Sequence, residues 1–104
     1  MKSIMLALML LVSSSVFAAN DPIDASFKSM GCFNCHAIDH KVVGPAFKDV
    51  STKYKGVAFA EDKLVIKVSQ GGKGVWGTAS MIANDPNKIK QTEIHRLVQY
   101  ILKL

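Results

Sequence analysis

Residues 32–36 of this chain read Cys32-Phe33-Asn34-Cys35-His36. Two cysteines three positions apart, followed at once by a histidine, form the pattern of c-type haem attachment. On one turn of helix, the two thiols can each add to a vinyl group of the same porphyrin, and the imidazole that follows can stand over the iron. The pattern therefore predicts one haem c, attached covalently through two thioethers and ligated by His36.

Other uses of a close cysteine pair have less support in the sequence. A thioredoxin-like dithiol needs a βαβ context, which the chain lacks, and a structural zinc site needs four ligands, of which no second pair follows. A disulfide is the simplest structural alternative, but it would close a loop too short to add much stability. A chain this small buries only about 60–65% of its unfolded surface, so a covalent haem would supply stabilisation that the core lacks.

The first 18 residues have the features of a secretory signal peptide. Lys2 precedes an apolar run over residues 4–12, and the segment ends in a small residue, Ala18. The run is too short to span a bilayer as a helix, which takes about 20 residues. We expect residues 1–18 to be cleaved and residues 19–104 to form a single periplasmic domain with no membrane span.

Most of the remaining chain has helical periodicity. Prolines and glycines mark the ends of the segments, and apolar residues recur at helical spacing between them. The expected helices begin near Pro22, Pro45 and Ala60 and end at Gly31, Gly56 and Gly71, and a last helix carries Ile94, Leu97, Val98, Ile101 and Leu102 on one face.

The stretch from Gly71 to Asp85 has no such period. It contains four glycines, the only tryptophan and Met81, a composition typical of a loop. No segment of the chain alternates apolar and polar residues as a half-buried strand would. The sequence therefore predicts an all-α domain of four short helices and one long loop.

A second iron ligand can be sought among the methionines and histidines. Of five methionines, three leave with the signal segment, and Met30 lies on the apolar face of the first helix, where we expect it to fill the core. Met81 lies in the aperiodic loop, free to close over the far face of the iron, and packing within that loop is its alternative role. His40, one helical turn beyond His36, and His95, on the outer side of the last helix, are expected to be solvated.

The chain resembles the class I cytochromes c, and specifically their short bacterial periplasmic branch. The resemblance rests on residues 31–39 (GCFNCHAID), 43–50 (VGPAFKDV) and 74–77 (GVWG), followed by Met81, and it covers essentially the whole chain after the signal. It implies a small cytochrome c fold, with four short helices and a Met-bearing loop wrapped around one haem. It also implies six-coordinate iron, with His36 and Met81 as the two axial ligands.

The resemblance implies further contacts to the haem. The Pro45 carbonyl would accept the proton on the other nitrogen of His36, which orients the ring and tunes its basicity. Trp76 would hydrogen-bond a haem propionate. Lys67 falls where the family often has a basic propionate partner, although a solvated lysine explains it equally well, and Asn84 matches an asparagine near the Met ligand.

One departure from the family concerns the loop around the methionine. The family usually brackets this residue with prolines, whereas residues 78–83 of this chain read TASMIA and contain none. Because proline restricts the unfolded loop, we expect this loop to open more easily than its proline-bearing counterparts.

Six-coordinate iron leaves no position for a substrate, so the ligand set favours one-electron exchange over catalysis. We expect a soluble, monomeric electron carrier and not an enzyme. By resemblance, a quinol-oxidising complex or another cytochrome would donate the electron, and a terminal oxidase, nitrite reductase or peroxidase would accept it. Two alternatives stay open: a haem-based sensor, in which Met81 is released to admit a small ligand such as CO or NO, and a haem subunit of a larger redox enzyme.

The charge balance bears on partners. The chain has 13 Lys and Arg against 8 Asp and Glu, a formal net charge of +5. An exported protein without a basic stripe is not expected to bind nucleic acid. Six lysines could steer the protein toward acidic partner surfaces, with a merely solvated surface as the alternative. These are Lys41, Lys48, Lys53, Lys55, Lys63 and Lys73.

Overall fold

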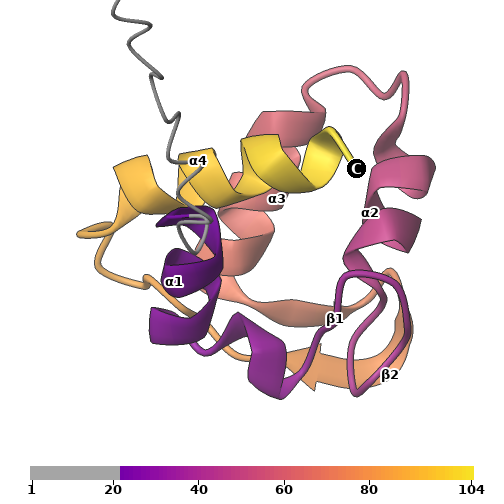
Figure 1. Cartoon of the computed structure of the whole chain (residues 1–104), viewed down its shortest axis with the longest axis horizontal. Coiled ribbons are helices and arrows are strands. Elements are labelled where there is room, and N and C mark those ends of the chain that lie inside the picture. Colours follow the sequence, from indigo (N-terminus) through magenta and orange to yellow (C-terminus); the bar gives the residue numbers. More distant parts are fainter. Residues whose placement is uncertain (1–21) are drawn as a thin grey trace, which may run out of the picture.

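The computed structural model of the chain describes residues 22–104, in which helices and one short hairpin surround the centre of the molecule (Figure 1). The predicted signal peptide, residues 1–18, lies outside the described residues. In Figure 1, α4 runs across the top, α3 passes behind it and down the middle, α2 stands at the right, the hairpin crosses the bottom and α1 lies at the left. The elements are α1 (Pro22–Ser29), the 3₁₀ helix η1 (Cys32–Asn34), α2 (Phe47–Tyr54), α3 (Ala60–Gln70), β1 (Gly72–Gly74), β2 (Gly77–Met81) and α4 (Gln91–Leu102).

The four predicted helices are confirmed, with small shifts at their ends. Helix α3 has the predicted bounds, whereas α2 begins at Phe47 and not at Pro45, because Ala46 is still extended, with φ −59° and ψ 143°. None of the helices between Pro22 and Leu104 has the length and apolar composition that crossing a membrane requires.

The prediction that residues 71–85 contain no strand is wrong. Strands β1 and β2 form an antiparallel pair in which Gly72 lies opposite Met81 and Gly74 opposite Gly77, with an irregularity in the register between them. Every residue of the hairpin except the half-buried Met81 is exposed. Because neither face of the hairpin packs on the core, its sequence carries no apolar alternation, and the signal on which strand prediction depends is absent.

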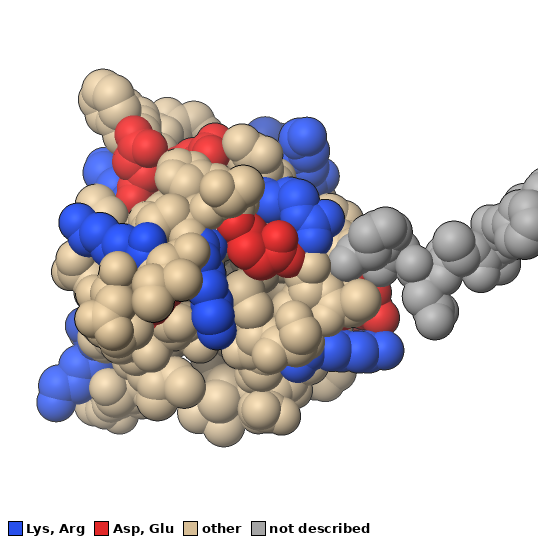
Figure 2. All heavy atoms as spheres, turned by 90° about the vertical axis from the view of Figure 1, so that its left-hand side faces the viewer, with Lys and Arg blue, Asp and Glu red and all other residues tan. Residues whose placement is uncertain are grey.

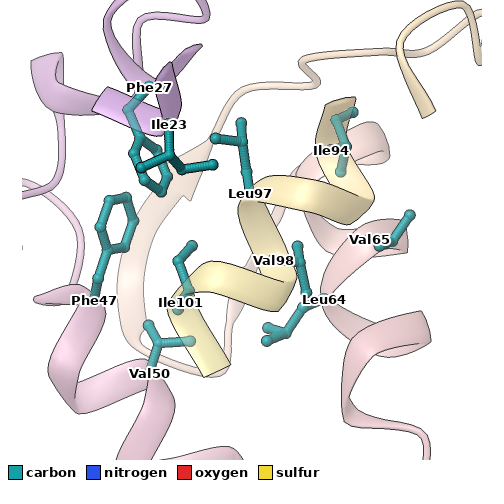
Figure 3. Close-up of a cluster of buried hydrophobic side chains, with 10 residues drawn as sticks. All are labelled: Ile23, Phe27, Phe47, Val50, Leu64, Val65, Ile94, Leu97, Val98 and Ile101. Carbon is teal, nitrogen blue, oxygen red and sulfur yellow. The ribbon is translucent and has the colours of Figure 1, made fainter. Parts of the chain in front are cut away.

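Helix α4 lies in the middle of the core (Figure 3). Its apolar residues recur at the i, i+3, i+4 and i+7 positions and so form one buried face. This face packs against side chains from the other three α-helices, and α4 thereby joins elements that are far apart in the sequence. The cluster consists of Ile23, Phe27, Phe47, Val50, Leu64, Val65, Ile94, Leu97, Val98 and Ile101.

Aromatic rings connect this core to the cysteine segment. Phe27 of α1 stacks on Phe47 of α2, with ring centroids 5.0 Å apart, and meets the edge of Tyr100 of α4 at 5.7 Å. Phe33, inside the cysteine motif, lies 5.4 Å from Phe27. The motif is therefore anchored to helices from both ends of the described chain.

A buried carboxylate, which sequence reasoning did not anticipate, fixes the start of α4. Asp85 is 4% exposed, and its carboxylate accepts hydrogen bonds from the backbone N–H groups of Ile89 (2.8 Å) and Lys90 (2.9 Å) and from the Gln91 side chain (2.7 Å). Burial alone would raise the pKa of Asp85, but these hydrogen bonds outweigh it and hold the pKa below its usual value. Asp85 thus keeps its charge and ties the end of the hairpin segment to α4.

Candidate haem site

The two cysteines lie on one tight turn. Cys32 begins η1 and Cys35 directly follows it, and the backbone N–H groups of Cys35 and His36 both donate to the Cys32 carbonyl, at 3.2 and 3.0 Å. No disulfide joins the two cysteines. Cys32 is half-buried, which raises the pKa of its thiol, and Cys35 is exposed. The turn therefore presents two thiols and an imidazole from adjacent positions.

The His36 ring is held from two sides. Its Nδ1 lies 2.8 Å from the Pro45 carbonyl oxygen, and because a carbonyl can only accept, Nδ1 carries the proton and Nε2 keeps its lone pair. The Phe47 ring stacks on the imidazole, with centroids 5.0 Å apart and an angle of 21° between the planes. The ring is therefore orientated in the tautomer that ligates a metal through Nε2.

Gly44 lies against the same imidazole, a contact that sequence reasoning missed. A Cβ at this position would lie 2.9 Å from His36 Nδ1 and 3.0 Å from Nε2. The backbone N–H groups of Val43 and Gly44 donate to the Cys35 carbonyl at 3.1 and 2.7 Å, which folds this segment back onto the motif. The only sequence signal was the glycine preceding Pro45, which by itself does not reveal the contact.

Met81 is the last residue of β2 and does not lie in a free loop, contrary to the prediction. It is half-buried and lies opposite Gly72 of β1. Three residues later, the Asn84 side chain donates to the carbonyls of Val68 and Ile82, both at 3.3 Å. Asn84 therefore fastens the segment that follows Met81 to the end of α3.

Trp76 belongs to the hairpin, and Lys67 belongs to α3 but lies against the hairpin. Trp76 lies at the turn between the strands and is 41% exposed, with Lys53 Nζ of α2 5.3 Å from its ring centroid, a cation–π contact. Lys67 is half-buried near the end of α3, and its Nζ lies 3.2 Å from where a Cβ on Gly72 would be. Sequence reasoning had placed Lys53 only among the steering lysines.

The two histidines that could replace Met81 as an iron ligand have other partners. His40 is exposed and pairs with Asp39 at 2.9 Å, and this hydrogen bond lowers the pKa of the Asp39 carboxyl. It does not lie one helical turn beyond His36 as predicted, because residues 37–44 are not helical. His95 Nδ1 lies 2.9 Å from Glu61 of α3, and hydrogen bonds from His95 and Gln99 lower the pKa of Glu61.

These donors fit a covalently held haem. The turn offers two cysteine sulfurs that no disulfide joins, at a spacing suited to two vinyl groups, and an imidazole with its Nε2 lone pair available. Comparison with known families decides the assignment, because the cytochrome c family model matches residues 22–104, the whole described part.

The chain belongs to the cytochrome c family.

Named relatives place this cytochrome within the family. It is 44% identical over 84 residues to cytochrome c-551 of Pseudomonas aeruginosa, covering 81% of this chain and 77% of the relative. It is also 44% identical over 79 residues to cytochrome c2 of Rhodocyclus tenuis, covering 74% and 86%. The crystal structure of Nitrosomonas europaea cytochrome c552 matches with a TM-score of 0.71 and 34% identity, covering 77% of this chain and 96% of that one.

These similarities confirm the predicted family and fold. The protein is a small class I c-type cytochrome whose homologues bind one covalently attached haem c. They are electron-transfer proteins and not enzymes. This cytochrome is therefore an electron-transfer protein, as the predicted ligand set indicated.

Proposed function

We propose that this cytochrome is a periplasmic one-electron carrier, exported by a signal peptide over residues 1–18. In this proposal Cys32 and Cys35 form the thioethers, and His36 and Met81 are the axial ligands. Its donor would be a quinol-oxidising complex or another cytochrome, and its acceptor a terminal oxidase, nitrite reductase or peroxidase.

The observation that carries the proposal is the hydrogen bond from His36 Nδ1 to the Pro45 carbonyl. It leaves Nε2 as the ligating atom and, together with Phe47, limits rotation of the ring. A bound haem supplies the couple between ferric and ferrous iron. The chain's part is to hold the same ligands in both oxidation states, and a thioether such as that of Met81 favours the reduced state relative to a second imidazole.

The exposed lysines support the proposal that the redox partners have acidic surfaces. All six lysines predicted to steer the protein are exposed, and they lie in the loop after the motif, on α2, just after α2, on α3 and on β1. Figure 2, which views the molecule from the left-hand side of Figure 1, shows a face on which acidic and basic side chains are intermixed. Ion pairs of this kind are Asp24 with Lys28 on α1 and Glu93 with Arg96 on α4. We therefore place partner recognition on the segments that carry the six lysines.

The first experiment is the visible spectrum of the oxidised, haem-bearing protein, with Met81→Ala and Met30→Ala as a matched pair. Sulfur bound to ferric haem gives a weak red charge-transfer band. We expect Met81→Ala to keep its haem, lose this band and have a lower reduction potential, because the thioether that favours ferrous iron is gone. Met30→Ala should keep the band, since Met30 packs against the core.

The other outcomes separate the alternatives. A band that survives in Met81→Ala contradicts the ligand assignment. Haem without any such band in the native protein means that the iron is bis-His or open, and the sensor hypothesis then replaces the carrier. Absence of haem from protein matured in the periplasm contradicts the attachment role of Cys32 and Cys35.

A further inference from the structure

Gly71 connects α3 to β1 and lies against the segment that carries Met81. Its backbone has φ +71° and ψ −159°, a region that is essentially restricted to glycine. A Cβ here would overlap the Met81 carbonyl oxygen and lie 2.8 Å from both the Ile82 carbonyl carbon and the Ala83 nitrogen. All three are backbone atoms, so none can swing aside as a side chain would. Gly71 therefore lets the backbone at the end of α3 lie against the backbone of residues 81–83, a contact that any other residue would prevent.

On both sides of Met81, hydrogen bonds hold its segment close to the end of α3 and to β1. Before it, β2 pairs with β1, where Met81 lies opposite Gly72. After it, the backbone N–H groups of residues 84 and 85 donate to the carbonyls of Val68 and Ser69, at 3.0 and 3.1 Å. The last carbonyls of a helix lack partners within it, so these bonds complete the end of α3 while they fasten the Met81 segment to it.

We infer that Gly71 is a positioning residue for the Met81 ligand. By lacking a Cβ, it sets how closely the Met81 backbone lies against the end of α3, and hence where the thioether is presented. This inference rests on the proposed role of Met81 as an axial ligand. A Cβ at position 71 would push the Met81 backbone away from α3 and weaken the sulfur–iron bond while leaving the sulfur in the chain.

Neighbouring glycines in the same hairpin provide matched controls. A Cβ on Gly72 (φ +124°) would approach only Lys67 Nζ, at 3.2 Å, the far end of a flexible side chain. A Cβ on Gly74 (φ +108°) would meet nothing within 4 Å. Alanine at any of these positions is strained by the positive φ, but only at Gly71 would it also overlap the Met81 segment. Comparing the three variants therefore distinguishes the effect of displacing Met81 from the effect of backbone strain alone.

The test compares haem-bearing Gly71→Ala, Gly72→Ala and Gly74→Ala proteins. We expect Gly71→Ala to lose most of the red sulfur–iron band, to have a lower reduction potential, and to bind added imidazole at the iron at a several-fold lower concentration than the wild type. Gly74→Ala should keep the band and the potential, and Gly72→Ala, which lies opposite Met81 in the hairpin, should change them much less than Gly71→Ala does. If Gly71→Ala keeps the native band and potential, or changes no more than Gly74→Ala, the inference is overturned.

A double-mutant cycle tests the inference even if the Gly71→Ala protein folds poorly. The unfolding midpoint in urea is measured for Gly71→Ala with Met81 intact and in the Met81→Ala background, with enough sodium sulfate present to keep all variants folded. We expect the loss caused by Gly71→Ala to shrink when Met81 is absent. An equal loss in both backgrounds would mean a purely structural glycine and would overturn the inference.

The same proteins distinguish a wrong ligand assignment from a wrong positioning role for Gly71. If Met81→Ala keeps the band, the proposed ligand is wrong, and the proposed function fails with it. If Met81→Ala loses the band but Gly71→Ala keeps it, Met81 remains the ligand and only the positioning role of Gly71 is refuted.

Discussion

At the scale of single residues, the site depends on side chains whose orientation is set by their neighbours in the chain. The His36 ring lies between Phe47, the Pro45 carbonyl and Gly44, so three neighbours determine the direction of Nε2. Such preorganisation keeps ligand geometry similar in two oxidation states, which lowers the rearrangement that accompanies electron transfer. The contacts of His36 matter for redox behaviour as much as the ligand itself does.

Gly44→Ala tests this preorganisation. The φ of Gly44 lies outside the left-handed region, so alanine adds no backbone strain, but its Cβ would approach the His36 ring to 2.9 Å or less. We expect a loss of about 1–3 kcal/mol in unfolding free energy, the usual cost of overpacking a tight site, together with a shifted reduction potential. Urea unfolding and potentiometry provide the measurements. An unchanged potential would show that the ring tolerates displacement.

The residues of the site differ in how well the sequence predicts them. The motif around Cys32 and His36 is recognisable because attachment chemistry fixes its spacing. Gly44 and Phe47 are not recognisable as contacts of His36, because what matters is their position in space and their types are common in loops and cores. The hydrogen bond to Pro45 was expected from the family resemblance, and the structure contains it.

At the scale of elements, helices were predictable and the hairpin was not. Helix α4 buries one face, so burial imposes a 3.6-residue period that can be recognised in the sequence. The hairpin is exposed and is held by backbone pairing, which leaves no pattern in side-chain polarity. Asp85 was missed for a related reason: an aspartate before a helix is usually exposed, and its burial depends on the packing of α3 and α4.

Asp85→Asn tests the anchor at the start of α4. The folded pKa of Asp85 lies below its ordinary value of 3.8, so its charged form stabilises the fold above that pH, and this contribution is lost as pH falls through the folded pKa. We expect the variant to be less stable at pH 7 and to lose less stability on acidification than the wild type. Urea unfolding at several pH values measures both effects. Asp62→Asn, an exposed carboxylate in the first turn of α3, is the control, and equal effects in the two variants would contradict the anchoring role.

At the scale of the whole molecule, net charge should control encounters. Without the proposed signal peptide, which contains Lys2, 12 Lys and Arg stand against 8 Asp and Glu, a formal net charge of +4, and two haem propionates would offset only part of it. Screening by salt weakens the attraction of opposite charges and the repulsion of like charges over about 10 Å at 0.1 M ionic strength. The cytochrome should therefore respond in opposite ways to small anionic and cationic redox reagents.

Stopped-flow oxidation of the reduced protein provides the measurement. With hexacyanoferrate(III) as oxidant, we expect the rate to fall as sodium chloride is added, and with tris(phenanthroline)cobalt(III) we expect it to rise. Two falling rates would point to an effect on the protein itself, and reversed slopes would mean that the surface around the site of electron exit is acidic.

The exposed hairpin has a consequence for the order in which the molecule loses its structure. Backbone amides exchange with deuterium through local openings, and the free energy of such openings is smallest where little apolar surface is buried. Within the described chain, β1 and β2 pair only with each other and contribute no side chain to the core cluster, whereas Ile94 and Val98 of α4 are fully enclosed. Amides of β1 and β2 will therefore exchange long before those of α4, and the proposed thioether ligand will be released in a partly open state whose helical core is still intact.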